Sequence, residues 1–432
     1  MRATRRRFLQ GTALAAGAAA VGCGQPASSP GATAGSAPAT GGVHPAIAAL
    51  TPMTAGITPI TDDERRSRIA KAQQLMAAQK IDALVIEGGS SMFYFTGTRW
   101  GLSERPFVVV IPARGDLAYV TPGFEESRAR EVTKFTDDIR VWQEDDSPYA
   151  VIAGVLRDRG AATGRVALDE RLRFFIADGL RAEAPRATYV LGTPITAGCR
   201  MFKSPAEIAL MQRANDITIE AFKAAHQTLR EGMTEADFRG QIEAAFRALG
   251  ANGSALVLFG EWSALPHGTV NPQRLKEGDV VLFDGGTSIE GYASDITRTT
   301  VFGTPTPRQR QVWDLELAAQ NAAFAAAKIG APCEAVDQAA RKVIVDAGFG
   351  PGYATPGLPH RTGHGIGLDG HEWTNFVLGN KTPLAPGMCF SDEPMIAIPG
   401  EFGIRLEDCL HMTEQGPVFF SKQSTAIDTP FA

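Results

Sequence analysis

Val280-Val281-Leu282-Phe283-Asp284-Gly285-Gly286 is an apolar run that ends in one acidic residue and two glycines, and Ser294-Asp295-Ile296-Thr297-Arg298 follows it closely. A turn near Ile289-Glu290 would fold these runs into a β-hairpin. In such a hairpin Asp284 and Asp295 face each other across the strands. The stretch therefore predicts an antiparallel hairpin that presents a pair of acids.

Glu393 and Glu407 form a second pair of acids. They lie symmetrically about Pro399-Gly400, a turn signal, so a second hairpin would bring them together. Acids held this close repel each other unless cations lie between them. With His364 added, the set suits two divalent metal ions, which can activate a water for hydrolysis. Any one of these residues alone would be an ordinary turn or loop residue, so the metal interpretation depends on all five together.

Two similar halves are indicated by the spacing of glycines and acids. Gly278 precedes Asp284 by the same interval that separates Gly387 from Glu393, and each glycine leads into an apolar strand. Helix-start signals occur at Ser204, where a capping box precedes a helical pattern, and again at residues 234–237. Two further helices are predicted over residues 308–329 and 334–347. Helices around antiparallel hairpins make an α+β catalytic domain.

Longer motifs around these residues resemble the creatinase/prolidase/methionine aminopeptidase superfamily, over roughly residues 200–425. The resemblance implies a pita-bread catalytic domain. Upstream, helix and strand patterns alternate as in an α/β domain, and residues 92–97 and 104–106 resemble the N-terminal domain of creatinases and Xaa-Pro peptidases. The catalytic motifs are residues 283–286, 294–298, 360–372, 393–394 and 403–408.

The resemblance implies a metal-binding role for each of the five residues. Asp284 would bind one ion, His364 and Glu393 would bind the other, and Asp295 and Glu407 would bridge the two. A hydroxide held between ions roughly 3.5–4 Å apart would attack the substrate carbonyl. Glu393 would carry the proton to the leaving nitrogen. Mn²⁺ is the expected metal because four carboxylates favour it, and Co²⁺ and Zn²⁺ are the alternatives.

Three other histidines and one arginine match non-ligand positions of the family. His267 would steady the leaving side of the peptide, although a surface loop residue is the alternative for this position. His371 would stabilise the developing oxyanion, and His360 would line the substrate pocket. Arg405 would organise the pocket and pair with a substrate carboxylate, or else form a structural salt bridge to a metal-site acid. One departure is Ala397, where many Xaa-Pro peptidases have a tyrosine.

These features predict a dinuclear-metal peptidase that hydrolyses Xaa-Pro bonds in dipeptides or short peptides, of the Xaa-Pro dipeptidase or aminopeptidase type. The absence of a C-terminal extension slightly favours the dipeptidase. The alternatives are another small-substrate C–N hydrolase or lyase on the same fold, and a non-catalytic pita-bread binding protein. Two-domain relatives are usually homodimers, so the resemblance also implies a homodimer.

The N-terminus predicts export. Residues 4–10 read as a twin-arginine signal within a signal peptide over residues 1–22. Cys23 is a candidate lipidation site, and cleavage in the alanine run with Cys23 incidental is the alternative. The predicted domains are a lipidated or flexible tether over 23–57, a creatinase-like N-terminal domain over 58–198 and the pita-bread domain over 199–432. The expected location is the periplasm, with a lipid anchor at Cys23.

Composition is that of an ordinary globular protein. The 432 residues are 44% hydrophobic and 21% charged, with a formal net charge of −5. Because no basic run follows the signal peptide, nucleic acid is excluded as an expected partner. Cys389 and Cys409 flank the glutamate strands. We expect buried free thiols there, with a disulfide as the alternative.

Overall fold

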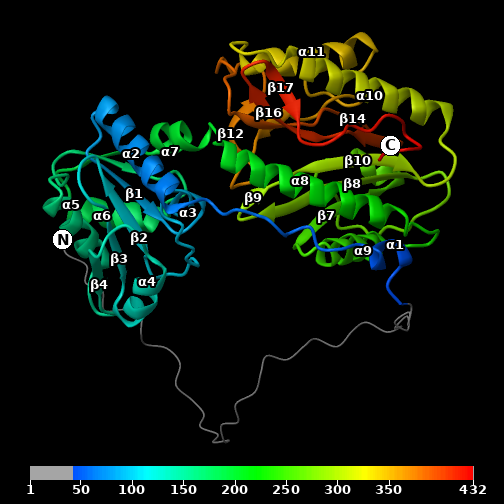
Figure 1. The fold of residues 1–432 in the computed structure, drawn as a ribbon. Coiled ribbons are helices and arrows are strands. Elements are labelled where there is room, and N and C mark those ends of the chain that lie inside the picture. The colour runs from blue at the N-terminus through cyan, green and yellow to red at the C-terminus, as the bar shows by residue number, and fades with distance from the viewer. Residues whose placement is uncertain (1–41, 432) are drawn as a thin grey trace, which may run out of the picture. The chain divides into compact units, whose positions relative to one another are not determined.

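The computed structural model describes residues 42–431, so the predicted signal peptide and Cys23 lie outside the described residues (Figure 1). The tether prediction is wrong from residue 45 onward. Helix α1 (Pro45–Ala48) begins there, capped by the side chain of His44, and its Ile47 is buried. Ile47 and Ile60 join the apolar cluster formed by helices α8 (Pro205–His226) and α9 (Glu235–Ala248). Apolar side chains in this stretch therefore fold onto the catalytic domain.

The N-terminal domain is built on a six-stranded sheet in the order β4-β3-β2-β1-β5-β6. Its central strand alternates between two cores, since Leu84 and Ile86 join one buried cluster while Ala83 and Val85 join the other. Both faces are covered, so the strands read as continuous apolar runs. The strands are β1 (Ala83–Glu87), β2 (Val108–Pro112), β3 (Ala118–Pro122), β4 (Ile139–Trp142), β5 (Arg165–Leu168) and β6 (Thr188–Leu191).

The helices of this domain include α2, whose N-cap is Thr61, and the Thr61 side chain accepts a hydrogen bond from the Glu64 N–H. The mixed helix and strand order confirms the predicted α/β domain. The helices are α2 (Asp62–Gln79), α3 (Ser90–Thr96), η1 (Gly123–Glu125), α4 (Glu126–Val132), α5 (Pro148–Asp158), α6 (Phe174–Glu183) and α7 (Thr193–Arg200).

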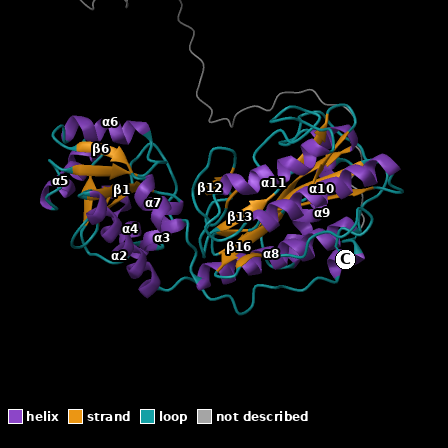
Figure 2. Cartoon of the chain, turned by 90° about the horizontal axis from the view of Figure 1, so that it is seen from above, coloured by secondary structure: helices purple, strands orange, loops and turns teal. Residues whose placement is uncertain are grey.

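The catalytic domain contains antiparallel sheets with the orders β10-β8-β7 and β12-β11-β13-β16-β17, and the ribbon β14-β15. Figure 2 shows these strands in orange, with purple helices on either side. The strands are β7 (Gly253–Phe259), β8 (Val280–Ile289), β9 (Tyr292–Ala293), β10 (Ile296–Val301), β11 (Gly363–Gly365), β12 (Glu372–Phe376), β13 (Cys389–Asp392), β14 (Met395–Ile398), β15 (Phe402–Arg405), β16 (Asp408–Thr413) and β17 (Gly416–Phe419), and a short helix η2 (Gly260–Ala264) follows β7.

Two helix pairs cover these strands. Helices α8 and α9 pack on β7 and β8 in one apolar cluster, while α10 (Pro307–Ala326) and α11 (Cys333–Asp346) pack on β13 to β16 in another. The predicted capping box is confirmed at Ser204, where the Ser204 side chain and Glu207 satisfy each other's backbone N–H groups. Thr306 caps α10 in the same way. The α+β prediction for this domain is confirmed.

The predicted similarity of the two halves is seen in their backbone conformation. Gly278 and Gly387 each adopt a φ of +87°, a conformation that favours glycine. The N–H of Gly278 donates to Phe302 O at 2.7 Å, and that of Gly387 donates to Met412 O at 2.8 Å. Each glycine thus ties the start of an acid-bearing strand to the far end of its hairpin.

The cysteines of the described part of the chain, Cys199, Cys333, Cys389 and Cys409, are buried free thiols. The expectation of thiols is confirmed and the alternative of a Cys389–Cys409 disulfide is wrong. Among residues 42–431, none of the helices has both the length and the apolar character needed to cross a bilayer.

Candidate active site

The first hairpin places Asp284 and Asp295 on one face. Asp284 pairs with Thr297 in the β8–β10 ladder, and Asp295 lies just before β10 begins. The two acids are therefore diagonal neighbours, not directly opposite as predicted. Residues two apart on a strand share a face, so Asp295 stays on the side of Asp284. The hairpin consequently delivers both carboxylates to the same place.

The second hairpin is interrupted where its acids lie. Strands β13 and β16 pair as far as Asp392 and Asp408, and pairing resumes in β14 and β15 at Met395 and Arg405. Pro394 falls in the gap and has no N–H to donate. The backbone N–H of Glu393 donates instead to Thr362 O at 2.8 Å, and that of Glu407 donates to Thr297 O at 3.2 Å. The interruption therefore ties each glutamate to a neighbouring strand of the site.

His364 lies on β11 and is oriented by its surroundings. Its Nδ1 is 3.1 Å from Gly365 O, which suits a proton on Nδ1 and leaves Nε2 toward the acids. Nε2 lies 3.2 Å from Glu393 Oε1 and 3.7 Å from Asp295 Oδ2. Burial acts to lower the pKa of His364, but the hydrogen bond and charge of Glu393 raise it overall. This ring is therefore aimed at the acids that would share a metal with it.

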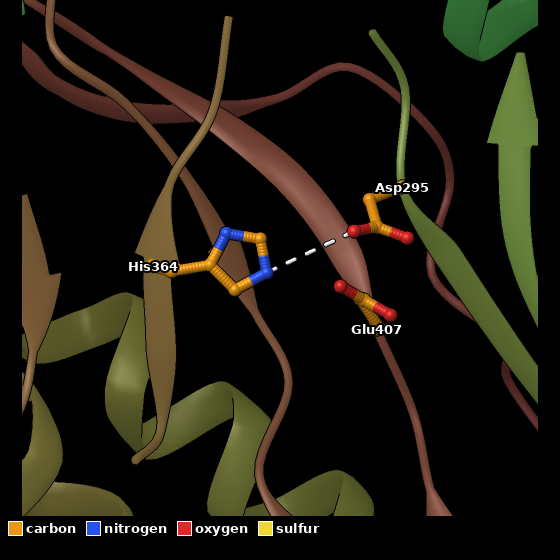
Figure 3. Close-up of side chains that lie close together, drawn as sticks. All are labelled: Asp295, His364 and Glu407. Carbon is orange, nitrogen blue, oxygen red and sulfur yellow. Dashed lines mark ion pairs between the residues drawn. The ribbon is translucent and has the colours of Figure 1, made fainter. Parts of the chain in front are cut away.

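Asp295, His364 and Glu407 converge on one point. One ligand atom from each lies within 4.8 Å of the others, and Figure 3 shows the three side chains directed toward a common space. His364 is 2% exposed and Glu407 is 1% exposed. Oxygen donors with one imidazole suit a divalent cation, so these residues fit the expected metal. Glu393 contacts this group through His364.

The pKa values of the carboxyl groups reflect their burial and the negative charges close to them. Burial and then the charge of Asp284 raise the pKa of Asp295 to about 7. Burial and then Asp295 raise the pKa of Glu407 well above its usual range. Burial also acts to raise the pKa of Glu393, yet the hydrogen bond and charge of His364 bring it down to about 2. A bound divalent cation would relieve the repulsion that these shifts report.

Arg405 contacts the remaining acid. Its Nη2 lies 2.5 Å from Asp284 Oδ2, and its Nη1 donates to Pro266 O at 3.2 Å. Its side chain is 3% exposed. The structure thus contains the salt bridge to a metal-site acid that was one of the two alternatives, while its role toward substrate stays a prediction.

The three other histidines surround the same site. The ring of His371 meets that of His364 edge-on, with centroids 4.1 Å apart at 80°. His360 has a buried Nε2 without a hydrogen-bond partner, and its Nδ1 lies 2.7 Å from Arg361 O. His267 is exposed, and its charge acts on the pKa of both His360 and His371. Burial lowers the pKa of His360 and of His371, so both rings are neutral at neutral pH.

Ala397 and His411 lie in packed positions. Ala397 is 1% exposed within an apolar cluster, and its backbone N–H and C=O pair with Gly357 at 3.0 and 3.1 Å. A tyrosine in its place would need space that this cluster fills. His411 packs against Phe420 with ring centroids 4.8 Å apart.

Two hydroxyl groups of the site were missed by the sequence reasoning. Thr297 Oγ1 donates to Glu407 Oε2 at 2.6 Å and accepts from Arg405 Nε at 3.1 Å. Ser391 Oγ donates to Glu393 Oε1 at 3.1 Å and accepts the His364 N–H at 3.0 Å. Each lies two residues from a predicted ligand, Asp295 or Glu393. The period of two along a strand would have identified them as neighbours on the same face.

Replacing Thr297 by valine should weaken metal binding. The change removes the hydroxyl that orients Glu407, and loss of such a supporting partner costs about 10- to 100-fold in metal affinity. Thr300→Val is the matched control, because Thr300 lies on the same strand and donates to Ile427 O instead. Competition titration with Mn²⁺ measures the metal affinity of both variants. Equal affinity of the two variants would contradict the role of Thr297.

The metal-free protein should lose stability as pH rises from about 5 to about 7.5. The folded pKa of Asp295, about 7, exceeds its ordinary value of 3.8. A raised carboxyl pKa stabilises the fold below the unfolded pKa, and that contribution is lost as pH rises through the folded pKa. Glu407 acts in the same direction, whereas Glu393 is ionised throughout this range.

Urea unfolding of chelator-treated protein at the two pH values measures this slope. Asp295→Asn should reduce it, and Asp314→Asn, at an exposed position of α10, should leave it unchanged. Excess Mn²⁺ should reverse the trend, because the metal binds deprotonated ligands. An unaltered slope in Asp295→Asn would show that this carboxyl is not the source.

Known proteins resemble the chain over most of its length. Residues 209–414 match metallopeptidase family M24, and residues 68–202 match the creatinase/prolidase N-terminal domain. A Xaa-Pro dipeptidase of Lactobacillus helveticus is 33% identical over 352 residues, which cover 80% of this chain and 94% of the relative.

Solved structures agree with this assignment. Dipeptidase PepE of Mycobacterium ulcerans is 32% identical with a TM-score of 0.80, covering 86% of this chain and 99% of that one. Prolidase of Thermococcus sibiricus is 28% identical with a TM-score of 0.77, covering 84% and 98%. The shared architecture is a creatinase-like N-terminal domain followed by a pita-bread domain. The chain therefore belongs to metallopeptidase family M24.

Proposed function

We propose that the protein is a dinuclear-metal peptidase that hydrolyses the bond before proline in dipeptides or short peptides. The observation that carries this proposal is the convergence of Asp295, His364 and Glu407, with Glu393 in contact through His364. Relatives named Xaa-Pro dipeptidase and dipeptidase PepE match nearly their full length, which favours dipeptides over longer peptides.

The five ligands would divide between two ions. Asp284 would serve one ion, His364 and Glu393 the other, and Asp295 and Glu407 both. Two divalent ions so held would supply Lewis acidity and would lower the pKa of a bound water. Mn²⁺ is the metal that we propose, because carboxylates dominate the set.

Glu393 would handle the proton. The hydrogen bond and charge of His364 keep its pKa at about 2 against the effect of burial, so the carboxylate is ionised at neutral pH and able to accept a proton from the attacking water. Ser391 donates to its Oε1 and steadies it. The same carboxyl group would then pass the proton to the leaving nitrogen.

The three histidines around the site would act on the peptide. His371 is exposed beside His364, so one ring N–H is available to the carbonyl oxygen as negative charge develops there. His360 would line the pocket, and His267 would steady the leaving side. Arg405, which is held by Asp284 and by Pro266 O, would organise the wall on which the substrate carboxylate rests.

Purified protein should cleave Xaa-Pro dipeptides faster than Xaa-Pro-Xaa tripeptides when Mn²⁺ is present. A panel of both substrate types, assayed with Mn²⁺ and with chelator, measures this. His364→Ala should abolish cleavage because it removes the imidazole ligand, while His411→Ala, whose ring packs on Phe420, should not. Bound metal without cleavage of any proline peptide would contradict the proposed substrate. Faster cleavage of tripeptides would identify an aminopeptidase.

We also propose that the protein is exported by the twin-arginine route, anchored in the periplasm through a lipid on Cys23, and homodimeric. The support for export and anchoring is the sequence of residues 4–10 and the position of Cys23. The homodimer is proposed from the resemblance to two-domain relatives. Fractionation should find the full chain in the membrane fraction and Cys23→Ala in soluble periplasm. The Arg5→Lys, Arg6→Lys double variant should stay in the cytosol. Cytosolic wild-type protein would contradict export, and light scattering measures the dimer.

A further inference from the structure

A buried group of charges includes Glu372, the residue that follows the exposed His371. Arg200 Nη2 contacts Glu372 Oε1, and it lies 2.7 Å from Asp369 Oδ2. Lys203 Nζ lies 2.9 Å from Glu372 Oε2. The side chains of Arg200, Lys203 and Glu372 are each 1% exposed. These ions are therefore almost fully removed from water.

Such burial is costly, so the group needs a reason beyond stability. Desolvation of buried ions can exceed their mutual attraction, and well-packed apolar residues are often at least as stabilising. Burial acts to raise the pKa of Glu372, but Lys203 and then Arg200 bring it down to about 2. Glu372 is thus a fixed anion held on both oxygens, which gives it a single orientation.

The held carboxylate fixes a short loop that contains His371. Residues 367–372, which we call the His371 loop, close on themselves where Asp369 N–H donates to Glu372 Oε1 at 3.2 Å. A Cβ added at Gly367 would lie 2.7 Å from both Glu372 Oε2 and Lys203 Cε. The loop backbone therefore packs tightly on the Lys203–Glu372 ion pair.

The cations come from a segment that is itself anchored. Arg200 is the last residue of α7, and Lys203 directly precedes the cap of α8. The Lys203 N–H donates to Gly387 O at 2.7 Å, at the start of the strand that leads to Glu393. This hydrogen bond links the segment that holds the His371 loop to the strand that leads to Glu393. None of Arg200, Lys203 and Glu372 belongs to the predicted site.

We propose that Glu372, held by ion pairs with Lys203 and Arg200, is a positioning residue that orients His371 toward the substrate carbonyl. The inference rests on the proposed role of His371. A displaced oxyanion donor loses contact mainly in the transition state, so kcat should fall while KM changes little. A merely structural ion pair would instead lower stability without such a split.

Lys203→Met tests the proposal in metal-loaded full-length protein. It keeps the length of the side chain and removes its charge, and kcat for a Xaa-Pro dipeptide should fall about 10- to 100-fold with bound metal unchanged. Glu372→Asp is the second variant in case Lys203→Met fails to fold. Arg68→Met is the control, because Arg68 forms a comparably buried ion pair with Glu207 at 3.4 Å.

The decisive comparison uses the His371→Ala background. If Glu372 acts through His371, Lys203→Met should add little further loss there, because the effects of coupled residues are not additive. A full additional loss in that background would overturn the proposal, and so would an equal fall of kcat in Arg68→Met.

A readout independent of activity separates this inference from the proposed function. Amide hydrogen exchange should quicken in residues 367–372 of Lys203→Met and stay unchanged there in Arg68→Met. Unchanged exchange in Lys203→Met would overturn the positioning of the loop. Quickened exchange in a protein that cleaves no proline peptide would reject the proposed substrate and leave the loop contact standing.

Discussion

The structure depends on keeping several carboxylates together inside a protein. Asp284, Asp295, Glu393 and Glu407 lie together, and burial and mutual repulsion raise the pKa of Asp295 and of Glu407. Basic side chains of the protein compensate part of this negative charge, because Arg405 pairs with Asp284 and His364 pairs with Glu393. Metal ions would complete this compensation, so the residues that repel one another in the metal-free fold would form a site for divalent cations.

Hairpin geometry makes this concentration of charge achievable. A strand presents alternate residues to one face, so one hairpin can deliver two acids, and two related halves deliver four. Gly278 and Gly387 set up both hairpins with the same backbone conformation. The break at Pro394 then frees the N–H groups of Glu393 and Glu407 to bind the neighbouring strands. The interruption of strand pairing in the second hairpin therefore lets its two glutamates hydrogen-bond to neighbouring segments of the site.

Features set by a few neighbouring residues could be predicted from the sequence, whereas contacts between distant segments could not. The cap at Ser204 set the start of α8 correctly because a capping box involves only four residues. The tether prediction failed at α1 because the burial of Ile47 depends on helices far along the chain. Arg405 could be placed near the acids, but which acid it binds follows from the folding of β15 onto β8. Thr297 was quoted within a motif and given no role, since a hydroxyl signals little until its partner is known.

Strand alternation has a second consequence behind the site. Asp392 and Asp408 adjoin Glu393 and Glu407, so they face the opposite side, toward α10. Arg298 neutralises Asp408 at 2.7 Å, whereas burial raises the pKa of Asp392 and of Glu316 well above the usual range. Burial therefore favours the protonated form of both acids. Were they ionised, their charge would add to the repulsion at Glu393, which lies one residue away. The front of the hairpin can gather carboxylates for metal because, at the back, Asp408 is paired with Arg298 and burial favours the protonated forms of Asp392 and Glu316.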